Sequence, residues 1–167
     1  MKLETDGYFH TEFIELLAKR IKPNVYLELG IDEGTTLHKV IPHAKKCIGV
    51  DKEFPKFCEW DKSFDYFNMT TEYFFNKNIL REYDELDLVF IDADHSYEAV
   101  KRDFYNVYRY VTQDGLILLH DTFPKDETDT HPDLCGDCYK FTHDLKNCGF
   151  EFMTLPFPPG LTIVRRV

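Results

Sequence analysis

Two spacings of apolar residues alternate along the chain. Short runs of consecutive apolar residues are typical of strands buried on both faces of a sheet, whereas apolar residues recurring every three or four positions are typical of helices. The clearest helical segment follows Ser96, a favourable N-cap, and steps from Tyr97 to Val111 before Asp114-Gly115 closes it. The predicted helices are 11–21, 35–41, 54–60, 71–75, 97–111 and 139–148. The predicted strands are 25–30, 46–51, 64–69, 86–92, 116–119, 150–155 and 161–164.

The alternation of strands and helices predicts an α/β fold with a doubly wound, mostly parallel sheet and helices on both faces. The last two strands are joined by a Pro/Gly-rich turn, 156–160, so we expect the last strand to be antiparallel to its neighbour. A length of 167 residues predicts a single domain, 1–167, with an N-terminal helix within 1–22 and the core in 23–167.

Composition narrows the function classes. The net charge of −10 would repel phosphate backbones, so we expect no nucleic acid partner. No apolar run is long enough to cross a bilayer, and the first residues lack the apolar centre of a secretion signal. With an odd number of cysteines, five, we expect free thiols in a reducing, cytoplasmic setting. The oligomeric state stays open, and a homo-oligomer is one way to cover the exposed face of a domain this small.

The turn after the first predicted strand argues against a dinucleotide. A dinucleotide fingerprint would need glycine at the first, third and sixth positions from Gly30, but Asp32 and Thr35 hold the third and sixth. A carboxylate at the middle position would repel a pyrophosphate. The next strand ends in Asp51, which is placed to accept the hydroxyls of a ribose. A nucleoside with positive charge and no phosphate chain fits better, and S-adenosylmethionine is such a ligand.

Several strand ends together resemble one protein family. The segments are Glu28-Leu29-Gly30-x-x-x-Gly34, Gly49-Val50-Asp51, Asp92-Ala93-Asp94-His95-Ser96-Tyr97 and His120-Asp121. In this order they resemble class I S-adenosylmethionine-dependent methyltransferases, and in particular the small O-methyltransferase-like branch related to sugar O-methyltransferases of antibiotic pathways. The resemblance implies a Rossmann-like, seven-stranded sheet with an antiparallel last strand, in agreement with the pattern above.

The resemblance also implies where the cofactor binds. Glu28, Gly30 and Gly34 would line its methionine part, and Asp51 would hold the ribose. The third predicted strand ends near the adenine, which would bring in Met69, Thr70 and Thr71. Asp92 would lie beside the cofactor and the reacting centre.

Methyl transfer to a hydroxyl requires that the hydroxyl lose its proton to a general base or to a base assisted by a divalent metal. By the resemblance, Asp92 and Asp121 would be metal ligands and Asp94 the base, with His95 and His120 as further catalytic candidates. His120 stands where the related enzymes have an acid. Magnesium prefers oxygen ligands, so a nitrogen ligand at His120 suits manganese, iron or zinc better, and a site without metal is the alternative.

Structural roles remain open for several of these residues. The charge of Asp94 can instead stabilise the N-terminus of the helix that begins near Ser96. The alternative role of His95 is a hydrogen bond to the backbone, and that of Asp51 is to cap a helix near Lys52. Cys135-Gly136-Asp137-Cys138 could form a zinc site with nearby histidines, although its compressed spacing favours structural thiols.

We therefore predict an S-adenosylmethionine-dependent methyltransferase acting on a hydroxyl of a small molecule or sugar, either with a divalent metal, Mg²⁺ or Mn²⁺, or without one. The alternatives are a non-catalytic module that binds the same cofactor and a dinucleotide- or nucleotide-sugar-binding enzyme on the same fold.

Overall fold

The computed structural model describes residues 9–54 and 64–167. One seven-stranded sheet has the order β3-β2-β1-β4-β5-β7-β6, in which β7 is antiparallel to both its neighbours and the other pairs are parallel. This confirms the predicted fold class, including the reversed last strand. The strands are β1 Val25–Leu29, β2 Lys46–Asp51, β3 Phe64–Asn68, β4 Leu86–Ile91, β5 Val111–His120, β6 Glu151–Leu155 and β7 Leu161–Arg165.

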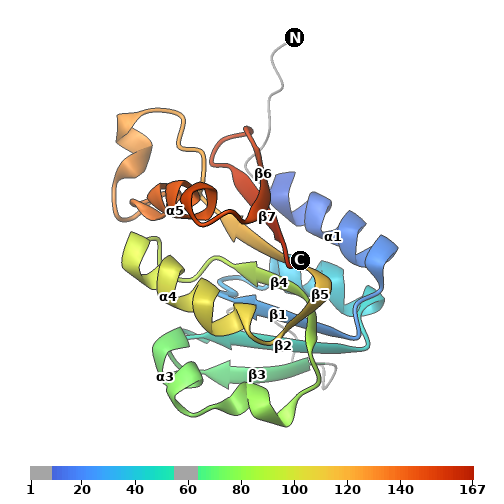
Figure 1. The fold of residues 1–167 in the computed structure, drawn as a ribbon. Coiled ribbons are helices and arrows are strands. Elements are labelled where there is room, and N and C mark those ends of the chain that lie inside the picture. Colours follow the sequence, from blue (N-terminus) through green and yellow to red (C-terminus); the bar gives the residue numbers. More distant parts are fainter. Residues whose placement is uncertain (1–8, 55–63) are drawn as a thin grey trace.

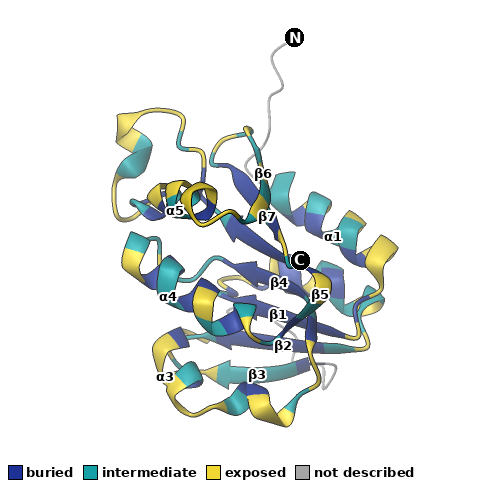
Figure 2. Cartoon of the chain, in the orientation of Figure 1, coloured by how far each residue is buried: buried dark blue, intermediate teal, exposed yellow. Residues whose placement is uncertain are grey.

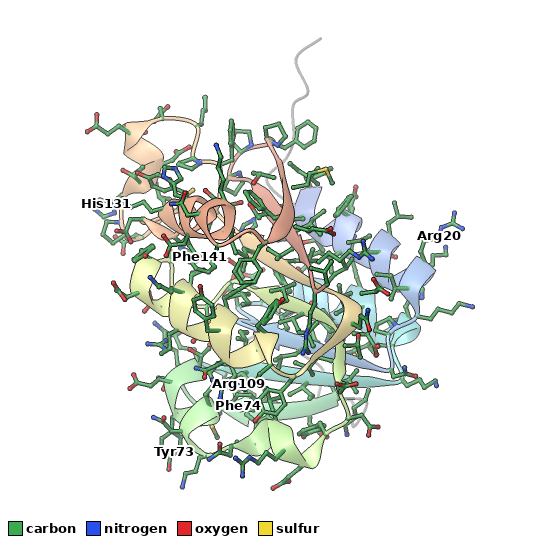
Figure 3. All side chains as sticks on the ribbon, viewed as in Figure 1. Arg20, Tyr73, Phe74, Arg109, His131 and Phe141 are labelled. Carbon is green, nitrogen blue, oxygen red and sulfur yellow. The ribbon has the colours of Figure 1, made fainter. Side chains whose placement is uncertain are left out.

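Helices cover both faces of the sheet, as Figure 1 shows, and each face has its own apolar core. On one face α3, α4 and α5 pack on the strands. The ring of Phe141 from α5, labelled in Figure 3, has its centroid 5.0 Å from that of Phe104 in α4. On the other face α1 and α2 pack on Tyr26, Leu88 and Leu118. The helices are α1 Phe9–Ile21, α2 Thr35–Val40, α3 Thr71–Asn76, α4 Tyr97–Tyr108 and α5 Phe141–Asn147.

The buried centre of the sheet follows directly from its sequence. All five residues of β1 are buried, and β1 lies between β2 and β4, so it contacts neighbours on both edges and on both faces. Figure 2 shows the same pattern, with buried strands at the centre and exposed residues on the outer sides of the helices. No helix in the described part of the chain is long and apolar enough to cross a membrane.

The boundary between α4 and β5 corrects one sequence prediction. The periodic pattern extended the helix to Val111, but α4 ends at Tyr108 and Val111 already pairs with Leu86 as the first residue of β5. The register then shifts before Leu116 pairs with Leu88, and Asp114 adopts a positive φ of 67° in the irregular stretch. The spacing from Val107 to Val111 fits a helix, but the position of Val111 is decided by its pairing with β4.

The predicted helix over 54–60 lies largely outside the described residues. The two predicted elements that follow it are close to the structure: β3 begins at Phe64, and α3 begins at Thr71, where the hydroxyl of Thr70 accepts the N–H of Tyr73 at 3.2 Å. The predicted second helix ends one residue earlier than expected, at Val40, and passes into a 3₁₀ turn, Ile41–His43.

Candidate active site

A cleft of about 830 Å³ opens at the carboxyl ends of the parallel strands. It lies where the strand order reverses between β1 and β4, which is where this class of sheet binds ligands. Two stretches around β1 and β2, within 28–36 and 51–54, line one half of it, which we call the cofactor half. The start of α1, the ends of β4 and β5, the segment 122–137 and the turn between β6 and β7 line the other, which we call the acceptor half.

The turn after β1 is held between its two neighbouring strands. Gly30 has a φ of +86°, and its N–H donates to the carbonyl of Val50 at 2.9 Å. On the other side the N–H of Asp92 donates to the carbonyl of Leu29 at 2.7 Å. A Cβ atom on Gly30 would lie 2.1 Å from the carbonyl oxygen of Asp92, so no other residue fits without displacing the backbone. Gly34, with a φ of +84°, is the N-cap residue of α2.

Asp51 holds the same turn from the end of β2. Its Oδ2 accepts the N–H groups of Ile31 at 2.7 Å and Asp32 at 3.0 Å, and its Oδ1 accepts that of Glu53 at 2.8 Å. Asp51 lines the cleft, and a carboxylate has about four acceptor positions, so it keeps capacity for a further hydroxyl. The predicted ribose contact stays a prediction, now beside an observed role in shaping the turn.

Glu28 is a buried acid at the wall of the cofactor half. Only 1% of it is exposed, and the hydroxyl of Tyr26 donates to its Oε2 at 2.5 Å. Burial raises the pKa of Glu28 to about 8, with Asp92 adding to the shift, although the bond from Tyr26 opposes it. A cation in the cleft would favour the ionised form, so Glu28 suits the ammonium group that S-adenosylmethionine carries.

The ends of β4 and β5 bring two carboxylates and two imidazoles together, as the sequence predicted for strands ending at one edge. The Nδ1 atom of His120 lies 3.1 Å from Asp92 Oδ1 and 3.4 Å from Asp121 Oδ1. The Nε2 atom of His95 lies 3.6 Å from Asp92 Oδ1 and 3.3 Å from Asp121 Oδ2. Each imidazole therefore bridges the same two carboxylates. We call these four residues the Asp/His cluster.

Charge within the Asp/His cluster is balanced internally. The hydrogen bond with Asp92 raises the pKa of His95 to about 9, against the effect of burial. Burial disfavours the charged form of His120 too, but Asp92 and Asp121 outweigh it and raise the pKa of His120 to about 10. The same contacts hold the pKa of Asp92 below its ordinary value despite its burial. Without a metal, both imidazoles are cationic at neutral pH.

The donor set also suits a divalent metal. One ligand atom each from Asp92, His95 and Asp121 lies within 4.8 Å of the others. The second ring nitrogen of His95, Nδ1, is bonded to the carbonyl of Leu134, which fixes the ring as in many metal-bound histidines. The sequence predicted His120 as the nitrogen ligand, and the structure brings His95 to the same carboxylates.

His10 was not predicted from the sequence. Its ring lies 4.1 Å from that of His120 and 5.8 Å from that of Phe90, measured between centroids, and it lines the acceptor half. The predicted helix began at Thr11, the residue after His10. A single sequence does not show that a residue near the start of this helix lines a cleft formed by distant parts of the chain. The hydroxyls of Thr11 and Thr36 lie 3.2 Å apart and tie α1 to α2.

Asp94 lies apart from the cleft lining. It is exposed, and its Oδ1 accepts the N–H of Ser96 at 2.9 Å, just before α4 begins. The bond with Ser96 lowers the pKa of Asp94 although burial opposes this. These contacts match the structural alternative for Asp94, and its role as a base stays a prediction.

The three residues predicted near the adenine also lie outside the lining of the described cleft. Thr70 caps α3, and the buried hydroxyl of Thr71 accepts a bond from Arg102 at 3.3 Å. Met69 packs against the core beneath α3. Because 55–63 are not described, contacts of these residues with a bound cofactor stay predictions.

The four described cysteines are free thiols. Cys135 is buried and lines the acceptor half, and the thiol of Cys138 donates to the carbonyl of Asp121 at 3.3 Å. Burial raises the pKa of Cys135 to about 12, with the nearby carboxylates adding to the shift, so it stays a protonated thiol. His131, on the same segment, lies at the outer edge of the molecule, with 64% of its side chain exposed (Figure 3).

Comparisons with solved structures identify the fold. An O-methyltransferase from Bacillus cereus, solved with S-adenosylhomocysteine, is 13% identical, with a TM-score of 0.74 over 99% of this chain and 84% of that one. The O-methyltransferase TomG from Streptomyces achromogenes, involved in tomaymycin synthesis and solved with S-adenosylmethionine, is 12% identical, with a TM-score of 0.74 over 95% of this chain and 79% of that one.

Sequence comparisons identify the family. An uncharacterised protein, R132, of Acanthamoeba polyphaga mimivirus is 28% identical over 134 residues. That alignment covers 68% of this chain and 59% of the mimivirus protein, so the chain spans less than two thirds of this curated relative. A family model described as a methyltransferase domain matches residues 27–122, which include most of β1, all of β2, β4 and β5, and the Asp/His cluster. With more than half of its length matched, the chain belongs to this methyltransferase family and has the fold of S-adenosylmethionine-dependent methyltransferases.

Proposed function

We propose that this protein uses S-adenosylmethionine to methylate a hydroxyl group of a small molecule or sugar. The observation that carries the proposal is the cleft itself: a glycine turn and a buried acid on one side face the Asp/His cluster on the other. When bound, S-adenosylmethionine supplies a methyl group activated by a sulfonium. The protein must then place the hydroxyl in line with that methyl group and accept its proton.

The chain's own residues divide this work. Glu28 would bind the ammonium group, Gly30 lets the turn approach the cofactor closely, and Asp51 would hold the ribose. In the acceptor half we assign proton acceptance to the carboxylates of Asp92 and Asp121, because the imidazoles of His95 and His120 already carry their protons in the metal-free protein. The hydrogen bond between Nδ1 of His95 and the carbonyl of Leu134 keeps Nε2 of His95 directed at these two carboxylates.

Cofactor binding tests the proposal and depends on Glu28. We expect S-adenosylmethionine affinity to rise with pH between about 6 and 8, because the cation favours ionised Glu28 and the free protein holds it largely protonated below its pKa of about 8. Isothermal titration at several pH values, in buffers of different ionisation enthalpy, measures the affinity and the protons released. We expect Glu28→Gln to flatten this pH dependence.

No binding of S-adenosylmethionine or S-adenosylhomocysteine by folded protein would contradict the proposed function. Binding without methyl transfer to any hydroxyl acceptor would favour the alternative, a non-catalytic cofactor-binding module.

We further propose that the Asp/His cluster holds a divalent metal through Asp92, Asp121 and an imidazole of His95 or His120. Such an ion would lower the pKa of an acceptor hydroxyl. Because a nitrogen ligand suits Mn²⁺ better than Mg²⁺, we expect tighter binding of Mn²⁺. The electron paramagnetic resonance signal of free Mn²⁺ measures binding directly, and we expect His95→Gln to weaken it by about tenfold or more. The exposed His131→Gln is the control, and equal effects of the two substitutions would contradict the assignment.

A further inference from the structure

We propose that the acceptor methylated in this cleft is a small molecule that carries no anionic group, so that phosphorylated, carboxylated and coenzyme A-linked acceptors are excluded. The inference rests on the proposed function, because it concerns the acceptor of the same methyl transfer. Three observations support it: the charges of the acceptor half, the partners of those charges, and the acceptors already present at the start of α4.

The acceptor half contains no lysine or arginine among its described lining residues. Proteins bind carboxylates and phosphates mainly through guanidinium forks, ammonium groups and free backbone N–H groups. Lys52 is the one lysine or arginine in the described lining of the whole cleft, and it belongs to the cofactor half. The ionisable side chains that the acceptor half does present are Asp92, Asp121, Asp129, His10, His95 and His120, together with the thiol of Cys135.

The positive charges of the acceptor half are already matched. His95 and His120 each contact both Asp92 and Asp121, so two imidazoles face two carboxylates within the protein. A divalent ion bound in the cluster would take the place of the imidazole protons and would face the same two carboxylates. Asp129 differs, because it makes no ion pair with any described residue and its Oδ2 accepts only the N–H of Lys125, at 3.0 Å. An anionic acceptor would therefore meet the unmatched charge of Asp129.

At the start of α4, which follows the Asp/His cluster, three N–H groups already have acceptors within the protein. Asp94 accepts that of Ser96 at 2.9 Å, and Asp137 accepts that of Tyr97 at 2.7 Å. The hydroxyl of Ser96 accepts the N–H of Ala99 at 3.4 Å.

The remaining walls suit an uncharged body. Phe90, Leu134, Pro158 and Pro159 line the acceptor half, and Leu134 exposes 51% of its surface beside the cluster. Apolar surfaces of this kind gain from contact with a ring or an aliphatic group and give nothing to a charged one.

Three phenols of the same size test the charge preference: uncharged 4-ethylphenol, cationic tyramine and anionic 4-hydroxyphenylacetate. Their affinities are measured by ligand-observed nuclear magnetic resonance for the whole protein, with and without S-adenosylhomocysteine. We expect the anion to bind about tenfold more weakly than 4-ethylphenol at low salt, and the gap to narrow at high salt because charge interactions are screened.

Two matched substitutions locate the effect. We expect Asp129→Asn, which keeps an acceptor for the N–H of Lys125, to narrow the gap about threefold. Asp133→Asn removes the same charge from the same segment, but Asp133 has 90% of its side chain exposed and lies outside the cleft lining, so we expect no change.

The outcomes are separable. Binding of 4-hydroxyphenylacetate as tight as or tighter than that of 4-ethylphenol would overturn the inference, as would an equal response to the two substitutions. Failure of the proposed function would show instead as a lack of S-adenosylhomocysteine binding, while the ranking of the phenols on the cofactor-free protein would still be measured.

Discussion

Replacing Gly30 with alanine is expected to lower the free energy of unfolding by about 3–5 kcal/mol. The added Cβ atom would lie 2.1 Å from the carbonyl oxygen of Asp92 and 2.7 Å from Cα of Ala93. Both are backbone atoms at the end of β4, so no side chain can rotate away. The positive φ of Gly30, +86°, adds the strain that any residue with a Cβ atom meets there. Urea unfolding followed by circular dichroism measures the loss.

Gly149 provides a matched control for this substitution. It has a similar φ, +77°, but a Cβ atom there would meet nothing within 4 Å. Gly149→Ala therefore reports backbone strain alone, and we expect a loss of about 1–2 kcal/mol. Similar losses for the two variants would show that the approach of β1 to β4 is not as close as the structure has it. Because the same contact shapes the turn, we also expect Gly30→Ala to weaken S-adenosylhomocysteine binding.

Asp121→Asn is expected to reduce methyl transfer by about 10²- to 10³-fold while changing S-adenosylhomocysteine affinity only slightly. Asp121 is 5% exposed, and its carboxylate faces His95 and His120, so the amide removes the charge that both imidazoles share. Its φ of +57° is one that asparagine also tolerates, so the backbone should stay as it is. Initial rates with saturating cofactor, together with titration of S-adenosylhomocysteine, separate the two effects.

The control for this variant is Asp114→Asn. Asp114 also has a positive φ, 67°, but 64% of its side chain is exposed, where it pairs with Arg165. We expect full activity, since this pair lies outside the cleft and an exposed ion pair contributes little. A loss of activity in Asp114→Asn, or none in Asp121→Asn, would contradict the assignment of the Asp/His cluster.

The sheet could be predicted from the sequence because its strands are buried on both faces. β2 was predicted with its observed bounds, and the predictions for β1 and β4 each ran only one residue beyond the observed end. The apolar pattern gave the wrong secondary structure at Val111, because its position is compatible with both a helix and a strand. Val111 lies four residues after Val107, which fits a helix, but its pairing with Leu86 makes it a strand residue.

The site was predictable where it depends on strand ends and not where it depends on packing. Asp92, His120 and Asp121 come together because parallel strands end at one edge of a sheet. His10 and Leu134 reach the same cleft from α1 and from an irregular segment, whose positions are set by tertiary contacts that a single sequence does not display. Asp94 lies within the same motif, but its carboxylate bonds to the N–H of Ser96 at the start of α4, a contact that its sequence position alone does not distinguish from a place in the cleft.

The two halves of the cleft are assembled in different ways, and this has an evolutionary consequence. Two short stretches joined through α2 build the cofactor half, whereas five separate parts of the chain each contribute a few side chains to the other. A mutation in any one of those five parts can reshape the wall without disturbing the glycine turn. Descendants of one ancestral protein could therefore diverge in the molecules they modify while retaining a common methyl donor.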